Sequence, residues 1–222
     1  MRVSTVVAPI FLVLSLFAAF LAMREYRVAR MSQGSTTDLF QTLAFTPPRR
    51  ALSLRADSVI FSACHRSLRS SLRQLQPAEV VNRIATYCLE TAKSAATATP
   101  NSGQAHYTWA LAAYQLEQPG IAAQHLARSQ QVAPFESWLA RRRFRLAVPL
   151  QQELQDGATD LVAPEVTGLL QSPNGRDLLA RYYVATPDLR DQITALAEDT
   201  NPEIQASLLG LIKKEIRRRN GS

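Results

Sequence analysis

Two cysteines are the residues of this chain whose spacing most directly suggests chemistry. Cys64 and Cys88 each lie 12 residues from Gln76 (76 − 64 and 88 − 76), just before Pro77. If residues 57–75 and 77–96 form an antiparallel helical hairpin about this proline, the two sulfurs meet across it. We expect a disulfide, which would place this part of the chain in an oxidising compartment. Two small buried thiols of a helical core are the alternative.

The other groups that could react do not form a recognisable site. His65, His106 and His125 are scattered and contain no H-x-x-x-H pair that would suit a metal. The chain also has no nucleophile elbow, phosphate loop or dinucleotide fingerprint. We therefore expect a non-enzymatic protein with no catalytic residue, no metal and no cofactor. An enzyme with an unrecognised site is the alternative.

The net charge of +7 is concentrated in two basic clusters. Solvated helix faces are the simplest interpretation, and contact with an anionic surface such as lipid headgroups is the sharper one. Aromatic residues are not interleaved with these cations as in a nucleic-acid platform, so nucleic acid is not an expected partner. The clusters consist of Arg141, Arg142, Arg143 and Arg145, and of Lys213, Lys214, Arg217, Arg218 and Arg219.

The composition predicts helices as the elements that position these residues. Twelve prolines and eight glycines suit many short helices, and alternating runs of Val, Ile and Thr are nearly absent. With 46% hydrophobic residues the chain can form a core. We expect an all-α fold with an anchor and its flanks at 1–30, a polar linker at 31–56 and one helical domain at 57–222.

The N-terminal stretch Ser4–Met23 is apolar and uncharged, and about 20 such residues can span a bilayer as a helix. A cleaved signal peptide is the rival interpretation. Ala19 and Ala22, the candidate cleavage positions, each follow a phenylalanine by two residues, which is unfavourable for cleavage. We expect an uncleaved single-pass anchor.

Two features of the sequence favour opposite orientations of this anchor in the membrane. Arg24, Arg27 and Arg30 follow the span and only Arg2 precedes it, which favours a cytoplasmic C-terminal domain. The expected disulfide favours the opposite, oxidising side of the membrane.

The stretch 101–134 has the pattern of two short helices between Pro100 and Pro134. Asn101 is expected to cap the first helix, with Gln104 completing a capping box. The pair Pro119-Gly120 restarts the chain as a second helix, along which the small or apolar positions are Ala122, Leu126 and Ser129.

A period near 34 with small residues where two helices cross resembles a tetratricopeptide (TPR) repeat. His106 stands where that pattern prefers tryptophan. The resemblance implies stacked helical hairpins with a groove for an extended peptide or a partner helix. His106, Tyr107 and Trp109 could line such a groove; packing inside the helical pair is the alternative.

The run 100–146 is also similar to small anchored TPR-like proteins of bacterial envelopes, several of which are associated with exopolysaccharide or O-antigen synthesis and export. This resemblance implies an inner-membrane scaffold whose periplasmic domain contacts proteins of an envelope complex. A cytoplasm-facing adaptor that binds an anionic membrane surface through its basic clusters is the alternative.

Residues 135–219 are expected to form further helices. In the first, 135–147, Phe135, Trp138, Leu139 and Leu146 should face inward and the arginines outward, and Pro149 should end it. Shorter helices should cover 164–170, 176–184 and 187–197, the last capped by Thr186. A final helix from Pro202 should pack on the domain through the stripe Ile204, Leu208, Ile212 and Ile216.

Overall fold

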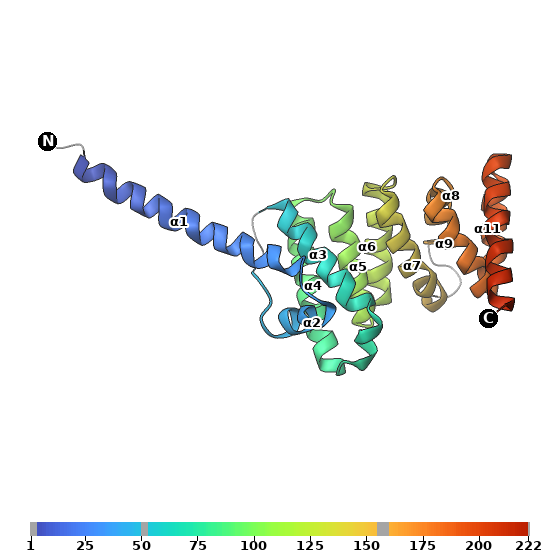
Figure 1. Cartoon of the computed structure of the whole chain (residues 1–222), viewed down its shortest axis with the longest axis horizontal. Helices are drawn as coiled ribbons and strands as arrows, with labels where there is room; N and C mark the ends of the chain where they lie inside the picture. Colours follow the sequence, from blue (N-terminus) through green and yellow to red (C-terminus); the bar gives the residue numbers. More distant parts are fainter. Residues whose placement is uncertain (1–3, 50–52, 155–159, 222) are drawn as a thin grey trace. The chain divides into compact units, whose positions relative to one another are not determined.

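The computed structural model describes residues 4–49, 53–154 and 160–221, with the side chains of 4–9 excluded. Within these ranges the protein is all-α, as predicted, with eleven α-helices, two short 3-10 helices and no strand (Figure 1). The helices are α1 (Ser4–Met31), α2 (Thr36–Phe45), α3 (Leu54–Arg69), η1 (Ser71–Leu75), α4 (Ala78–Ala98), α5 (Gly103–Gln115), α6 (Pro119–Val132), α7 (Ser137–Leu154), α8 (Ala163–Leu170), α9 (Pro173–Ala185), η2 (Pro187–Leu189), α10 (Arg190–Glu198) and α11 (Pro202–Asn220).

The chain divides into two compact units, unit 1 (Met1–Thr97) and unit 2 (Ala98–Ser222). The predicted single domain from residue 57 is therefore wrong. The cysteine hairpin α3–α4 belongs with the N-terminal segment, because α1 and α2 both pack on α3.

The predicted polar linker 31–56 is also wrong, since it contains helix α2. Ser35 and Asp38 form a reciprocal capping box at its start, which satisfies backbone N–H groups that the first turn leaves open. Leu39, Phe40 and Leu43 are buried. This apolar face makes α2 part of the core of unit 1.

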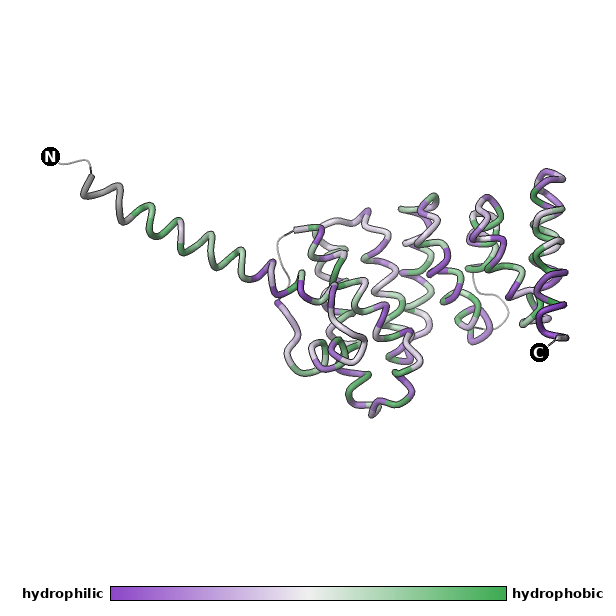
Figure 2. The backbone as a smooth tube through the Cα atoms, in the orientation of Figure 1, coloured by the Kyte–Doolittle hydropathy of each residue, from purple (hydrophilic) through white to green (hydrophobic). Residues whose placement is uncertain are grey.

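Helix α1 changes character along its length. Val28 and Met31, near its C-terminal end, are buried, and this end packs on α3. Residues 10–20 are exposed at every position, and Figure 2 shows them as a mainly hydrophobic stretch. The expected span Ser4–Met23 falls in this helix, although the side chains of residues 4–9 lie outside the description. Among the described residues, no helix meets the length and hydropathy needed to cross a membrane.

Unit 2 is a succession of packed helices. Each of α5 to α8 contacts the next helix along the chain, and α5 with α7, α7 with α9 and α8 with α10 are also in contact. The series ends where α11 packs on α9. Helical hairpins therefore stack on one another in chain order within this unit (Figure 1).

The predicted starts of the helices of unit 2 are right at some positions and wrong at others. Pro119 begins α6, and Asn201 caps α11 by accepting a bond from the N–H of Ile204. Asn101 does not cap α5: the cap is Ser102, whose hydroxyl accepts from the N–H of Ala105. Thr186 makes no side-chain cap bond to the helix that follows it.

Helix α7 differs from its predicted bounds at both ends. It begins at Ser137, so Phe135 lies in the preceding connection and is 96% exposed instead of inward-facing. Pro149 lies inside the helix and does not end it. A proline forgoes one backbone bond there, and the buried neighbours Val148 and Leu150 hold the helix to the core. On α11, Leu208 and Ile212 are buried as predicted, but Ile216 is exposed.

The start of α5 and the end of α6 approach closely at Gly103. A Cβ atom added there would lie 2.4 Å from the Cβ of Ala133 and 3.3 Å from a methyl of Leu139. The hydroxyl of Ser129 donates a 2.7 Å hydrogen bond to the carbonyl of Gly103. Small residues at this crossing therefore let the two backbones meet.

We expect Gly103→Ala to lower the free energy of unfolding of unit 2 by about 1–3 kcal/mol, because the added methyl must push α5 away from Ala133. Gly120→Ala is the matched control: no atom lies within 4 Å of its added Cβ, and alanine favours a helix. Urea unfolding of both variants measures the difference. Equal stability of the two variants would contradict the close approach.

Candidate functional site

The structure brings Cys64 and Cys88 together as a disulfide between α3 and α4, with their Cα atoms 5.9 Å apart. Both side chains are fully buried, beside Ile60 and Ile84 of the same helices. The first helix of the hairpin, predicted over 57–75, ends at Arg69, and Leu72 is exposed in η1. The pairing and the hairpin match the arrangement that the spacing about Gln76 predicts.

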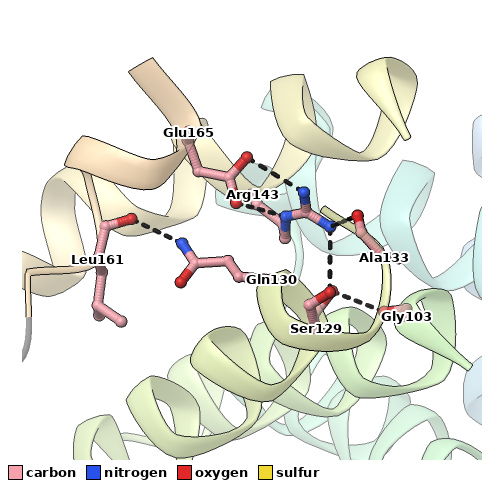
Figure 3. Close-up of polar contacts among 7 residues, drawn as sticks. All are labelled: Gly103, Ser129, Gln130, Ala133, Arg143, Leu161 and Glu165. Carbon is pink, nitrogen blue, oxygen red and sulfur yellow. Dashed lines mark hydrogen bonds and ion pairs between the residues drawn. The ribbon is translucent and has the colours of Figure 1, made fainter. Parts of the chain in front are cut away.

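A buried polar junction joins three helices of unit 2 (Figure 3). Arg143 on α7 is only 1% exposed, and its guanidinium forms a two-point ion pair with Glu165 on α8, which is 2% exposed. The same guanidinium donates to the carbonyls of Ser129 (3.3 Å) and Ala133 (3.0 Å) at the end of α6. One side chain thus donates to two carbonyls at the end of α6, of which Ser129 already accepts the N–H of Ala133, and neutralises a buried carboxylate.

Arg143 was predicted to belong to an exposed anionic-surface patch, and that prediction is wrong. Its position lies on the buried stripe of α7, with Leu139 four residues before it, Leu146 three after it and Leu150 seven after it. This helical spacing already indicated a buried position for Arg143. The adjacent Arg141 and Arg142 made the run look like one exposed basic cluster. The arginine run therefore mixes surface cations with one buried structural cation.

The polar junction is suited to holding helices together and not to reacting with a substrate. Burial raises the pKa of Glu165, and the hydrogen bond from Arg143 opposes that rise. Nearby, the amide of Gln130 donates to the carbonyl of Leu161 at 2.8 Å, which links α6 directly to the segment that leads into α8 (Figure 3). The functional groups are occupied by the protein itself.

Two of the predicted groove residues lie in a ring cluster formed by His106, Trp109 and His125. The rings of Trp109 and His125 stack with centroids 3.6 Å apart, and the Nδ1 atoms of His106 and His125 are 3.2 Å apart. Tyr107, the third predicted groove residue, is buried. His125 comes from α6, so the sequence pattern of α5 alone did not reveal it.

The hydrogen bonds assign the tautomers of the two histidines. Nε2 of His106 lies 3.0 Å from the carbonyl of Pro100, which can only accept, so this nitrogen carries the proton. Nδ1 of neutral His106 then accepts, and Nδ1–H of His125 donates to it. Burial lowers the pKa of both rings, and that of His125 falls from 6.5 to about 4. The cluster is therefore built for two neutral imidazoles.

We expect the ring cluster to lose stability as the pH falls from about 6.5 to about 4. In this pH window the imidazole of His125 binds a proton in the unfolded chain but stays neutral in the folded protein. Burial, and the nearby charge of Arg128 on His106, oppose protonation of the folded pair. His125→Gln removes this proton uptake. The difference in Tm between the wild type and His125→Gln should therefore change in favour of the variant as the pH is lowered from 7 to 4. A difference that does not depend on pH would contradict the assignment.

The remaining cations of the two predicted basic clusters lie on the surface in different settings. Arg142 is half-buried with its guanidinium 5.0 Å from the ring centroid of Trp138. Arg218 and Arg219 both donate to Glu215. Arg218 and Arg219 are exposed, as are Arg145, Lys213, Lys214 and Arg217, whereas Arg141 is half-buried. Neither cluster is thus a uniform cationic face.

Within the described ranges, no group of three or more His, Cys, Asp or Glu side chains is placed to hold a metal ion. Comparison with known proteins gave no match: no family model matches the chain, and neither a similar curated protein nor a similar solved structure was found.

Proposed function

We propose that the protein is a non-enzymatic scaffold, anchored in a membrane by residues 4–23, whose helical units bind protein partners. The observation that carries the proposal is the exposed apolar surface of α1. Ile10, Phe11, Leu12, Val13 and Leu14 are each more than half exposed, so every face of the helix is apolar. A helix that is apolar all round needs an apolar environment.

The balance of free energies favours a bilayer for this segment. Leu, Ile, Phe and Val each contribute about −0.3 to −0.6 kcal/mol at the centre of a spanning helix. The sequence from Ser4 to Met23 contains no charged residue to oppose this gain, and Tyr26 and Arg27 follow where interfacial residues are favoured. In water the same side chains would form an exposed patch prone to association.

The packing of unit 2 supports a binding role. Successive helices contact one another along the chain, and small residues at Gly103, Ala122 and Ser129 allow close crossings, which is compatible with the proposed TPR-like stack. Stacks of this kind present extended surfaces to peptides or partner helices. With polar side chains of the junction already occupied, binding of a protein surface fits this unit better than catalysis.

The Cys64–Cys88 disulfide favours a periplasmic location for the helical units in a bacterial inner membrane. By its resemblance to anchored envelope proteins, the partner complex would synthesise or export an envelope polysaccharide. Isolation of the cross-linked protein from membranes should then recover proteins of envelope assembly. Recovery of none of them would count against this part of the proposal.

The anchor is tested by charge substitution. Leu14→Arg combined with Phe17→Arg should release the full-length protein from membranes washed with alkaline carbonate, because each arginine costs about 2.5–3.5 kcal/mol at the helix centre. Leu75→Arg, at another exposed leucine of unit 1, is the matched control and should leave the protein in the membrane. Release of the wild type by the same wash would reject the anchor.

The side of the membrane is tested by trapping thiols in intact cells with a bulky maleimide, followed by gel electrophoresis. Protection of Cys64 and Cys88 until they are reduced would support the periplasmic location. If both thiols react without a reductant once the protein is unfolded, the alternative of a cytoplasm-facing adaptor is favoured.

A further inference from the structure

Unit 1 contains a cavity of about 810 Å³ between the C-terminal half of α1 and the segment that carries α2. Its lining begins at Phe20, inside the apolar stretch, and continues through Arg24 and Arg27 to Met31 on the same helix. Arg24, Arg27 and Met31 follow Phe20 by four, seven and eleven residues, so one face of α1 forms a wall of the cavity. Ligand sites in proteins have volumes of this order.

The lining of the cavity is strongly cationic. Arg24, Arg27 and Arg30 of α1 and Arg49 from beyond α2 contribute four guanidinium groups, against the single carboxylate of Asp38. That carboxylate accepts hydrogen bonds from the N–H and hydroxyl of Ser35, so its lone pairs are partly used. Guanidinium groups gathered in this way bind phosphate through paired N–H bonds.

Contacts from α3 hold the two walls of the cavity in place. Arg66 on α3 donates to the carbonyl of Met31 at 2.8 Å and to that of Gly34 at 3.5 Å, where α1 ends and the chain turns toward α2. On another side of α1, Glu25 accepts bonds from the N–H and hydroxyl of Ser53. The carboxylate nearest to the arginines in sequence is thus engaged elsewhere.

We propose that this cavity binds the phosphate headgroup of an anionic phospholipid of the membrane that holds residues 4–23. The proposal rests on the anchor described under the proposed function. Arg24 and Arg27 follow the apolar stretch within about 6 Å of helix rise, which is the depth of the headgroup layer. Phe20 at the cavity edge lies at the boundary where the acyl chains of such a lipid begin.

The test is native mass spectrometry of the full-length protein released from neutral detergent micelles, with phosphatidylglycerol or phosphatidylcholine of the same acyl chains as probes. Arg27→Gln combined with Arg30→Gln removes two exposed cavity arginines. The variant should bind phosphatidylglycerol about 25-fold more weakly, since each arginine near the surface contributes about fivefold. Its binding of phosphatidylcholine should not change.

The matched control is Lys213→Gln combined with Lys214→Gln, which removes two exposed cations from α11. It should bind phosphatidylglycerol as the wild type does. Equal weakening in both double variants would mean that overall charge attracts the lipid and would overturn the proposal. Displacement of phosphatidylglycerol by inorganic phosphate at the same concentration would overturn the assignment to a lipid.

Two further measurements separate the possible causes of failure. Formation of the Cys64–Cys88 disulfide in the arginine variant, seen as a shift in gel mobility on reduction, shows that unit 1 has folded. Retention of the wild type in carbonate-washed membranes tests the anchor by itself. A retained wild type that binds both lipids equally rejects the cavity site alone, whereas a released wild type rejects the anchor on which it rests.

Discussion

Replacing Arg143 with alanine is expected to lower the free energy of unfolding of unit 2 by about 3–5 kcal/mol. Glu165 would remain buried without its cation, and the carbonyls of Ser129 and Ala133 would lose a donor. Urea unfolding of the full-length protein in neutral detergent, followed by tryptophan fluorescence, measures this loss. Trp109 and Trp138 are the two tryptophans of the sequence, and both lie in unit 2.

Two further variants show whether the loss comes from the ion pair. Lys213→Ala removes the same charge from an exposed site and should change stability by less than about 0.5 kcal/mol. Arg143→Leu combined with Glu165→Leu buries no unpaired charge. The double variant should therefore lose clearly less unfolding free energy than Arg143→Leu and Glu165→Leu lose in sum as single variants. A cost below about 1 kcal/mol for Arg143→Ala would mean that other contacts hold α6, α7 and α8 together.

Reduction of the Cys64–Cys88 disulfide is expected to destabilise unit 1 by about 3 kcal/mol. The bond closes a loop with a sequence separation of 24, and opening it returns conformational freedom to the unfolded chain. Because unit 1 contains no tryptophan, its stability is followed by hydrogen exchange measured by mass spectrometry. Peptides from α3 and α4 should exchange faster after reduction.

The control for this experiment is Cys64→Ala combined with Cys88→Ala, which should exchange fast in these helices with or without reductant. Peptides from α7, in unit 2, should exchange at the same rate in every sample. If reduction leaves the exchange of α3 and α4 unchanged, packing alone holds the hairpin and the disulfide adds little.

Local signals in the sequence predicted those features that local physics determines. Pro119 and the pair Asn201-Pro202 mark helix starts because a proline at the first turn and a polar cap satisfy or avoid open N–H groups. The equal spacing of Cys64 and Cys88 about Gln76 favoured their pairing over two separate buried thiols, because a hairpin brings equidistant residues together.

Several features that depend on contacts between different helices were not predicted. Helix α2 has only ten residues, too short to be stable alone, and it exists because Leu39 and Leu43 are covered by other helices of unit 1. The partner of Arg143 is 22 residues away on α8, and its charge is acceptable in the core only once Glu165 is placed beside it. His125 joins Trp109 through the register of α5 on α6, which composition does not encode.

The packing of the C-terminal end of α1 limits how freely the rest of unit 1 can move relative to this helix. A flexible tether of 26 residues, as expected for 31–56, would let a domain explore a radius of about 30 Å around its attachment point. Here Val28 and Met31 are packed into unit 1 and Arg66 fastens the end of the helix. Helix α1 and the rest of unit 1 therefore turn as one body. If α1 spans a membrane as proposed, a partner would meet unit 1 at a fixed distance from the bilayer and on a fixed face.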